Sequence, residues 1–342
     1  MTTQFHFSKE VYHKQLLNWF FNQGRHDLPW QRCATPYATW VSEVMLQQTQ
    51  VATVKPYFER FMQRFQTIES LAEASQDTVL NYWSGLGYYA RGRNLHKAAK
   101  KMVQDHHSQV PNTPDALLAL PGIGQSTANA ILSLAFNQPL PILDGNVKRV
   151  FARLFALQTP IDTTETEQLL WHYANALMHH DQPAAYTQAQ MDLGALVCQR
   201  KPLCQHCPLT NFCLAYQQKI ATQLPYKKPK RAKTTIDKTY GCYYHQGKIW
   251  LSPFKQTGVW GGMYGLPVIE LKGQPEEYLI THLGQGRHVF THFYLNYTVY
   301  LIEVNDFIIP DDQGQWIDLT DYDAYPIPKV FTQYFARLVA NC

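Results

Sequence analysis

The feature that most constrains the fold is a glycine hairpin between two predicted helices, Leu120-Pro121-Gly122-Ile123-Gly124. Apolar residues with helical spacing predict one helix over residues 113–119 and a second over residues 125–136. Because Gly122 and Gly124 have no side chains, backbone N–H groups can approach a phosphate closely, at a helix N-terminus that favours anions. An ordinary turn between two helices has the same local pattern, so the rest of the chain decides between the two interpretations.

Composition places the chain among globular proteins. Its 342 residues are enough for two or three domains, and 45% of them are hydrophobic while 16% are charged. The net charge of +4 is compatible with a polyanionic partner but does not identify one. No apolar run approaches the roughly 20 residues of a membrane span, and the first residues have no targeting pattern. We therefore expect a cytoplasmic protein.

Two patterns of hydrophobicity divide the chain. From residue 8 to about residue 216, apolar residues recur with a helical period. After residue 236 they alternate instead, which predicts strands at Tyr240–Tyr244, Ile249–Ser252 and His288–Glu303. The sequence thus predicts a mostly helical protein with a smaller α+β part. The expected boundaries are a helical domain over 1–221, a linker over 222–236 and a C-terminal domain over 237–342.

The linker is strongly basic. Five of the seven residues from Lys227 to Lys233 are lysine or arginine, and prolines interrupt the run. A solvated spacer has this composition. The same residues would also suit a DNA backbone, to which they would add salt-dependent affinity. Both interpretations stay open.

Four cysteines lie together in sixteen residues: Cys198, Cys204, Cys207 and Cys213, spaced C-x5-C-x2-C-x5-C. This density indicates a metal centre rather than a disulfide framework. A single zinc ion usually draws on two short pairs separated by a longer loop, and only Cys204 and Cys207 form a short pair here. We therefore favour a [4Fe–4S] cluster over zinc.

Several motifs now support a family resemblance. They are Leu28-Pro29-Trp30, the run from Trp40 to Val51 (WVSEVMLQQTQV), the run from Gly85 to Arg91 (GLGYYAR) and the run from Leu143 to Val150 (LDGNVKRV). With the hairpin and the cysteine loop, in this order, the chain resembles the helix-hairpin-helix DNA glycosylases related to endonuclease III. Within them it is most similar to the adenine-specific, MutY-type branch. The likeness is strong over residues 9–220. Relatives usually have six residues between the first two cysteines, whereas this chain has five, so the conformation of that loop is a point of departure.

The chemistry of base excision directs attention to two carboxylates. Breaking an N-glycosidic bond requires an acid at the leaving group and a carboxylate near the oxocarbenium-like sugar. Glu43 lies among apolar residues of a predicted helix, where burial would raise its pKa; a partly exposed helix glutamate is the alternative. Asp144 is placed to cap the following helix, whose N–H groups would keep it ionised. The resemblance implies that Glu43 is the general acid, that Asp144 stabilises the oxocarbenium ion and that Asn146 helps to hold the site.

The residue at position 126 bears on whether the DNA strand is also cleaved. Relatives that also cleave the strand carry a lysine nucleophile in the second helix of the hairpin, and this chain has Ser126 there. Without that amine we expect an intact abasic site. The resemblance therefore implies a monofunctional base-excision repair glycosylase that acts on adenine mispaired with 8-oxoguanine or guanine.

The resemblance also implies how DNA is held. Adenine must leave the base stack. Gln48 and Tyr88 would enter the helix beside the opposing base, supported by Leu46 and Thr49. Candidates for the adenine pocket are Trp30, Leu28, Arg25 or His26, Val51 and Gln188. The remaining predicted contacts to DNA are Leu86, Gly122, Gly124 and Ser126.

The C-terminal part resembles the MutT-like, Nudix-type domain of adenine glycosylases, beginning near Gly258–Pro267. The metal-binding glutamates of Nudix hydrolases are missing, since only Glu270, Glu276 and Glu277 follow, at the wrong spacing. We expect such a domain to bind rather than hydrolyse. In the family a Phe-Ser-His loop reads 8-oxoguanine, and the matching residues here are Phe290, Thr291 and His292. The alternative is that these three residues belong to an ordinary strand.

Two other functions remain as alternatives. One is an endonuclease III-like glycosylase and lyase for oxidised pyrimidines, which Ser126 disfavours. The other is a non-catalytic DNA-binding protein that uses its iron–sulfur cluster as a sensor, which the presence of both Glu43 and Asp144 disfavours. The preferred interpretation implies double-stranded DNA with A:8-oxoguanine or A:G mispairs as partner, a monomer with no membrane contact, and a place in the bacterial cytoplasm on nucleoid DNA.

Overall fold

The computed structural model describes residues 5–229, 232–273, 278–308, 310–311 and 313–341. Lys230 and Arg231 of the basic linker, and Glu276 and Glu277, therefore lie outside the described residues. The chain divides into two compact units, Met1–Met62 with Ala98–Lys230 and Gln63–Lys97 with Arg231–Cys342. The helical segment 63–97 thus groups with the C-terminal part of the chain. Within the described residues, no helix is long and apolar enough to span a membrane.

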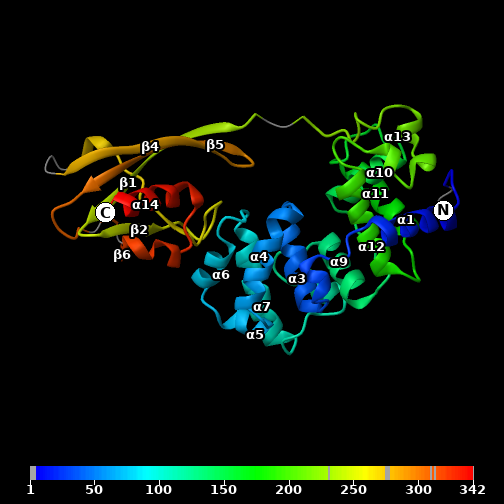
Figure 1. The fold of residues 1–342 in the computed structure, drawn as a ribbon, viewed down its shortest axis with the longest axis horizontal. Helices are drawn as coiled ribbons and strands as arrows, with labels where there is room; N and C mark the ends of the chain where they lie inside the picture. Colours follow the sequence, from blue (N-terminus) through cyan, green and yellow to red (C-terminus); the bar gives the residue numbers. More distant parts are fainter. Residues whose placement is uncertain (1–4, 230–231, 274–277, 309, 312, 342) are drawn as a thin grey trace. The chain divides into compact units, whose positions relative to one another are not determined.

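The first unit is helical, as predicted. Its elements are α1 (Lys9–Gln23), α2 (Pro29–Arg32), α3 (Pro36–Leu46), most of α4 (Val51–Arg64), the second half of α7 (Ala90–Asp105), α8 (Pro114–Leu118), α9 (Gln125–Phe136), α10 (Gly145–Leu154), α11 (Thr164–Ala176), α12 (Pro183–Asp192), a π-helix (Leu193–Val197), two 3₁₀ turns (Cys204–His206 and Thr210–Phe212) and α13 (Leu214–Gln217). Figure 1 shows α1, α10, α11 and α12 packed together.

One apolar core cluster packs α1, α10, α11 and α12 together. Tyr12, Leu16 and Phe20 of α1 pack with Phe151 of α10 and Tyr186 of α12, and all five are buried. Several helices begin where the sequence supplies a capping side chain. Thr35 Oγ1, for example, accepts a hydrogen bond from Ala38 N (3.1 Å), which fixes the start of α3. These contacts make a rigid support for the loops between the helices.

The second unit combines a mixed sheet with helices. Its helices are α5 (Ile68–Glu73), α6 (Gln76–Trp83) and α14 (Lys329–Asn341), with 3₁₀ turns at Leu271–Gly273 and Leu319–Ala324. Its strands are β1 (Thr234–His245), β2 (Lys248–Pro253), β3 (Tyr264–Gly265), β4 (Leu279–Val289), β5 (Phe293–Glu303) and β6 (Gln315–Asp318). The order is β3-β2-β1-β5-β4, with β6 paired to β2, and β1 runs parallel to β5. Figure 1 shows α14 against the sheet, where Phe331 contacts Tyr240 at 4.9 Å between ring centroids.

The prediction of one strand over His288–Glu303 is wrong. β4 ends at Val289 and β5 begins at Phe293, so residues 290–292 form the turn of an antiparallel hairpin. Phe290 N donates to Phe293 O (3.0 Å) across this turn. The alternation of apolar residues continues through the tight turn, and periodicity alone therefore could not reveal it. The overall prediction, a helical core followed by a smaller α+β domain, is confirmed.

Candidate active site

The glycine hairpin has the predicted form. α8 ends at Leu118, and Gly124 is the N-cap of α9. Gly122 has a φ of +80°, a backbone conformation that a residue with a side chain rarely adopts. A Cβ atom on Gly124 would meet nothing within 4 Å, so the backbone at the start of α9 is open. This arrangement leaves the first N–H groups of a twelve-residue helix accessible to an anion.

Glu43 lies on α3 with its side chain half-buried, among the buried neighbours Ser42, Val44 and Met45. Burial, and secondarily the negative charge of Asp144, raises the pKa of Glu43 to about 7. A carboxyl group with such a pKa is partly protonated at neutral pH, as a general acid must be. The structure therefore brings the two predicted carboxylates into electrostatic contact.

Asp144 begins α10, as predicted. Its Oδ1 accepts a hydrogen bond from Val147 N (2.7 Å), and its Oδ2 accepts one from Asn146 Nδ2 (3.1 Å). Burial raises the pKa of Asp144, while these hydrogen bonds and the charge of Arg149 act in the opposite direction. The N-cap thus only partly offsets the desolvation of the Asp144 carboxylate.

Asn146 is held from its other side by Arg149. Arg149 Nη2 donates to Asn146 Oδ1 (2.8 Å) and to Gly194 O (2.7 Å), and its Nε donates to Cys198 O (2.7 Å). Gly194 lies on the π-helix so close to Asn146 that a Cβ atom there would be 2.5 Å from the Asn146 Cβ. One arginine therefore joins the aspartate loop to the first cysteine of the four-cysteine loop.

A second buried network surrounds Asp192, the last residue of α12. Its carboxylate accepts hydrogen bonds from Arg25 N (2.6 Å), Arg25 Nε (2.9 Å), Arg25 Nη2 (2.6 Å) and Gln188 Nε2 (2.8 Å). The Asp192 side chain is 0% exposed and the Arg25 side chain 19% exposed, so the carboxylate of the pair is shielded from water. Because Gln188 donates its amide group to a carboxylate, its carbonyl oxygen is turned away from Asp192. His26 instead bonds Phe20 O (2.9 Å).

The other predicted pocket residues, and the predicted DNA contact Ser126, also belong to the helical unit. Trp30 is buried, with its ring edge-on to Phe58 at 5.4 Å, and Leu28 is buried as well. Val51 is the half-buried first residue of α4. Ser126 Oγ accepts a hydrogen bond from Leu143 N (3.0 Å), next to Asp144.

The predicted DNA-inserting residues share an unusual backbone. Gln48 follows α3 and has a φ of 58°, and its side chain is exposed. Leu46 and Thr49 flank it half-buried, joined by a Thr49 N to Leu46 O hydrogen bond of 3.2 Å. In the other unit, Tyr88 has a φ of 50° and is 47% exposed, whereas Leu86 is buried. Residues with a side chain rarely adopt positive φ, and such conformations concentrate at functional sites.

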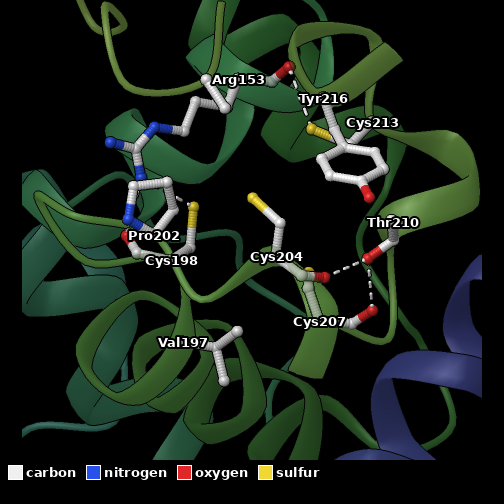
Figure 2. A pocket seen from close by; sticks show the side chains of 10 residues that line it. Arg153, Val197, Cys198, Pro202, Cys204, Cys207, Thr210, Cys213 and Tyr216 are labelled. Carbon is white, nitrogen blue, oxygen red and sulfur yellow. Dashed lines mark hydrogen bonds between the residues drawn. The ribbon is translucent and has the colours of Figure 1, made fainter. Parts of the chain in front are cut away.

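The four cysteines line one cavity, as Figure 2 shows. Its volume is about 300 Å³, counting the part open to solvent. Cys198, Cys204 and Cys213 turn their sulfur atoms toward this space. Burial raises the pKa of Cys207 to about 12 and that of Cys213 to about 11, so they would become thiolate ligands only beside a positively charged centre. Among the described residues, no group of three or more His, Cys, Asp or Glu side chains has a geometry that could hold a single metal ion, and this includes the four cysteines.

Arg153 is buried beside this loop and donates hydrogen bonds to several of its backbone carbonyls. It donates to Cys198 O (3.2 Å), Cys198 Sγ (3.3 Å) and Gln199 O (2.6 Å) through Nη1, and to Arg200 O (3.2 Å) through Nη2. Its Nε donates to Leu224 O (3.0 Å). The shorter segment between Cys198 and Cys204 therefore has a defined conformation.

The predicted recognition residues form the turn between β4 and β5. Thr291 and His292 are exposed at its tip. Phe290 instead packs against His288, Phe293 and Trp260, with ring centroids 4.5, 4.6 and 5.2 Å away. The turn thus presents two polar side chains on an aromatic base.

Comparison with known proteins supports the same fold and domain order. Residues 41–176 match the HhH-GPD superfamily base excision DNA repair proteins, and residues 239–337 match the NUDIX domain. The solved structure of a thermostable thymine-DNA glycosylase aligns with a TM-score of 0.56 at 25% identity, over 61% of this chain and 97% of that one. An endonuclease III–DNA complex has the same fold, with a TM-score of 0.53 at 22% identity, over 63% of this chain and 99% of that one. The fold and the site define a helix-hairpin-helix DNA glycosylase.

Relatives in sequence narrow the class. The adenine DNA glycosylase of Buchnera aphidicola from Schizaphis graminum is 34% identical over 93% of this chain and 96% of its own length. The mouse adenine DNA glycosylase is 44% identical over 63% of this chain and 43% of its own length. The human adenine DNA glycosylase is 44% identical over 61% of this chain and 40% of its own length. The chain belongs to the adenine DNA glycosylase family.

Sequence reasoning missed three residues of this site: Arg149, Asp192 and Gly194. Asp192 had a visible signal, because it is the one charged residue in an otherwise apolar segment, Met191–Val197. Arg149 and Gly194 had none, since a helix arginine and a helix glycine are common. Their importance appears only once Asn146 lies between them.

Proposed function

We propose that this adenine DNA glycosylase excises adenine mispaired with 8-oxoguanine or guanine and leaves an abasic site. The observation that best supports the chemistry is the pair formed by Glu43, with a pKa of about 7, and Asp144, which accepts a hydrogen bond from Val147 N. An acid that is partly protonated at neutral pH beside a hydrogen-bonded carboxylate is the arrangement that glycosidic cleavage requires.

In this mechanism Glu43 gives its proton to a ring nitrogen of the flipped adenine. The bond between C1′ and the base nitrogen then breaks, and the base leaves with both bonding electrons. Asp144, oriented by Asn146, faces the positive charge that develops at C1′ and stabilises it. Water adds to C1′ and loses a proton, which completes hydrolysis.

The product is expected to be an intact abasic site. Ser126, at the position of the lyase lysine in bifunctional relatives, offers a hydroxyl already hydrogen-bonded to Leu143 N. Lys148, the lysine nearest to Asp144 in sequence, forms an ion pair with Glu167 (2.6 Å). These observations support hydrolysis rather than Schiff-base chemistry, and they disfavour the endonuclease III-like alternative.

The four cysteines are proposed to hold a [4Fe–4S] cluster. Four sulfur donors around one cavity fit such a group, whereas a single zinc ion would require every sulfur within about 2.3 Å of one point. The cluster would fix the loop that Arg149 and Arg153 join to the aspartate loop. The C-terminal turn, through Thr291 and His292, would contact the base opposite adenine. A monomer in the bacterial cytoplasm, acting on nucleoid DNA, remains our prediction.

The test uses labelled duplexes with A opposite 8-oxoguanine, G or T, incubated with and without alkali. Strand breaks that require alkali and occur only for the first two duplexes would support the proposal. Breaks without alkali would refute the monofunctional product. Tight binding without excision would favour a DNA-binding sensor instead.

A further inference from the structure

Two cations gather on one tyrosine beside the recognition turn. Lys233 Nζ lies 5.2 Å from the centroid of the Tyr294 ring, and the Arg287 guanidinium carbon lies 5.0 Å from it. Both distances are within the range of cation–π contact. Lys233 is the last basic residue of the linker run, so this part of the basic linker contacts the C-terminal sheet.

The strand register explains the cluster. Arg287 of β4 lies opposite Asn296 of β5, and Val289 lies opposite Tyr294. Residues directly opposite in an antiparallel pair point to the same side, so Arg287 and Tyr294 are diagonal neighbours on one face. Arg287 is exposed, and Val289 is 58% exposed. This side of the hairpin is therefore open to a partner.

Lys233 also fixes the turn itself. Its Nζ donates to Phe290 O (2.6 Å), the carbonyl just before Thr291 and His292. An ammonium group has three donors, and this bond uses one of them. The linker lysine thus orients the turn and keeps two donors for a further partner.

The charges on this face are not balanced by ion pairs. Arg287 Nε donates to Asn296 Oδ1 (2.8 Å), and Asn296 Nδ2 donates to Asp237 Oδ1 (2.8 Å). The carboxylate of Asp237 therefore contacts Arg287 only indirectly, through the side-chain amide of Asn296. Neither Lys233 nor Arg287 makes an ion pair within the described part of the chain. The two terminal amino groups of Arg287 can therefore donate a bidentate pair of hydrogen bonds to one phosphate.

We propose that Lys233, Arg287 and Tyr294 form a phosphate-binding site for the DNA strand that carries the base opposite adenine. This inference rests on the proposed role of the 290–292 turn. The turn and the two cations are joined by the Lys233–Phe290 hydrogen bond, so a strand read at Thr291 passes its backbone next to them. The site would set the register of the strand, while the turn reads the base.

The salt dependence of binding tests the site. The probe is a duplex with a tetrahydrofuran abasic-site analogue opposite 8-oxoguanine or G, titrated with the full chain by fluorescence anisotropy at several salt concentrations. Arg287→Met and Lys233→Met remove one charge each and keep an apolar stem. Each lost phosphate contact is expected to reduce the slope of log affinity against log salt by about 0.9. Lys248→Met is the matched control, because Lys248 of β2 is ion-paired with Asp318 of β6 (2.9 Å), and its loss should leave the slope unchanged.

The two variants should differ in selectivity. Arg287→Met should weaken binding opposite 8-oxoguanine and opposite G by the same factor, and Arg287→Lys should restore the slope. Lys233→Met should also reduce the preference for 8-oxoguanine, because the turn loses its hydrogen bond. Unchanged slopes in both methionine variants, or an equal change in Lys248→Met, would overturn the site. A wild-type protein without preference for 8-oxoguanine would refute the role of the turn instead, and the slopes would still decide the phosphate site.

Discussion

Replacing Glu43 by glutamine removes the proposed acid and preserves its shape. With a pKa of about 7, Glu43 is about one-quarter protonated at pH 7.5, whereas with its ordinary pKa of 4.5 it would be about one-thousandth protonated. Burial and the Asp144 charge therefore raise the population of the active acid about 200-fold at that pH. We expect Glu43→Gln to reduce single-turnover excision by about 10²–10⁴-fold.

The same shift predicts a gain in stability for the variant. Between pH 4.5 and 7 the unfolded chain ionises Glu43 while the folded chain keeps it protonated, so folding of the wild type weakens as pH rises through this window. A pKa shift from 4.5 to about 7 corresponds to about 3 kcal/mol in the free energy of unfolding. Glutamine does not titrate. Its advantage in free energy of unfolding should thus be absent below pH 4.5, grow up to about pH 7 and then level off.

Two measurements decide this prediction. Wild-type single-turnover rates on an A:8-oxoguanine duplex should fall above pH 7 as Glu43 loses its proton, and urea unfolding at pH 5 and pH 8 should show the pH-dependent gain. Glu59→Gln is the control, since Glu59 is exposed on α4 and the same charge is removed away from Asp144. A rate that stays constant from pH 6 to 9, or a Glu43→Gln protein that excises normally, would refute the reasoning.

Four further predictions concern the surroundings of the site. Arg149→Met, which loses the bonds to Asn146 and Gly194, should slow excision at least tenfold while leaving DNA affinity unchanged in anisotropy; an unaltered rate would contradict its orienting role. Gly194→Ala places a Cβ 2.5 Å from that of Asn146 and should cost about 1–3 kcal/mol in urea unfolding and slow excision, unless the π-helix shifts freely. Asp192→Asn, which breaks a buried pair with Arg25, should lower the free energy of unfolding by about 3 kcal/mol, a loss that would be missing if water reached the pair. Thr291→Ala should weaken the preference for 8-oxoguanine over guanine in competing excision assays without abolishing excision, and equal selectivity would count against the recognition turn.

Local signals were enough to predict the parts of the site that depend on neighbours in sequence. The hairpin follows from Pro-Gly and from Gly124, and the position of Asp144 follows from the preference of aspartate for helix N-caps. These interactions span only a few residues, so a pattern in the chain contains all the information they need.

Other parts depend on contacts that no local pattern encodes. The Arg25–Asp192 pair joins residues 167 positions apart, and the turn at residues 290–292 interrupts an alternation that still looks like a continuous strand. The grouping of residues 63–97 with the C-terminal part is likewise made by distant hydrogen bonds, such as Asn81 Nδ2 to Asp323 O (2.9 Å) and Ser84 Oγ to Ile327 O (3.1 Å). Helical periodicity predicts that segment 63–97 folds, but not which surface it packs on.

The π-helix explains why these distant contacts meet near Asp144. It begins after Asp192, which Arg25 and Gln188 hold, and it ends at Val197, next to the first cysteine. Between these ends Gly194 approaches Asn146 and accepts a hydrogen bond from Arg149. Short π-helical turns are rare and frequently occur at functional sites, because the wider turn redirects backbone carbonyls. Here the wider turn links the residues around Gln188, the support of Asp144 and the cysteine loop, so a change in any one of the three should alter the position of Asn146.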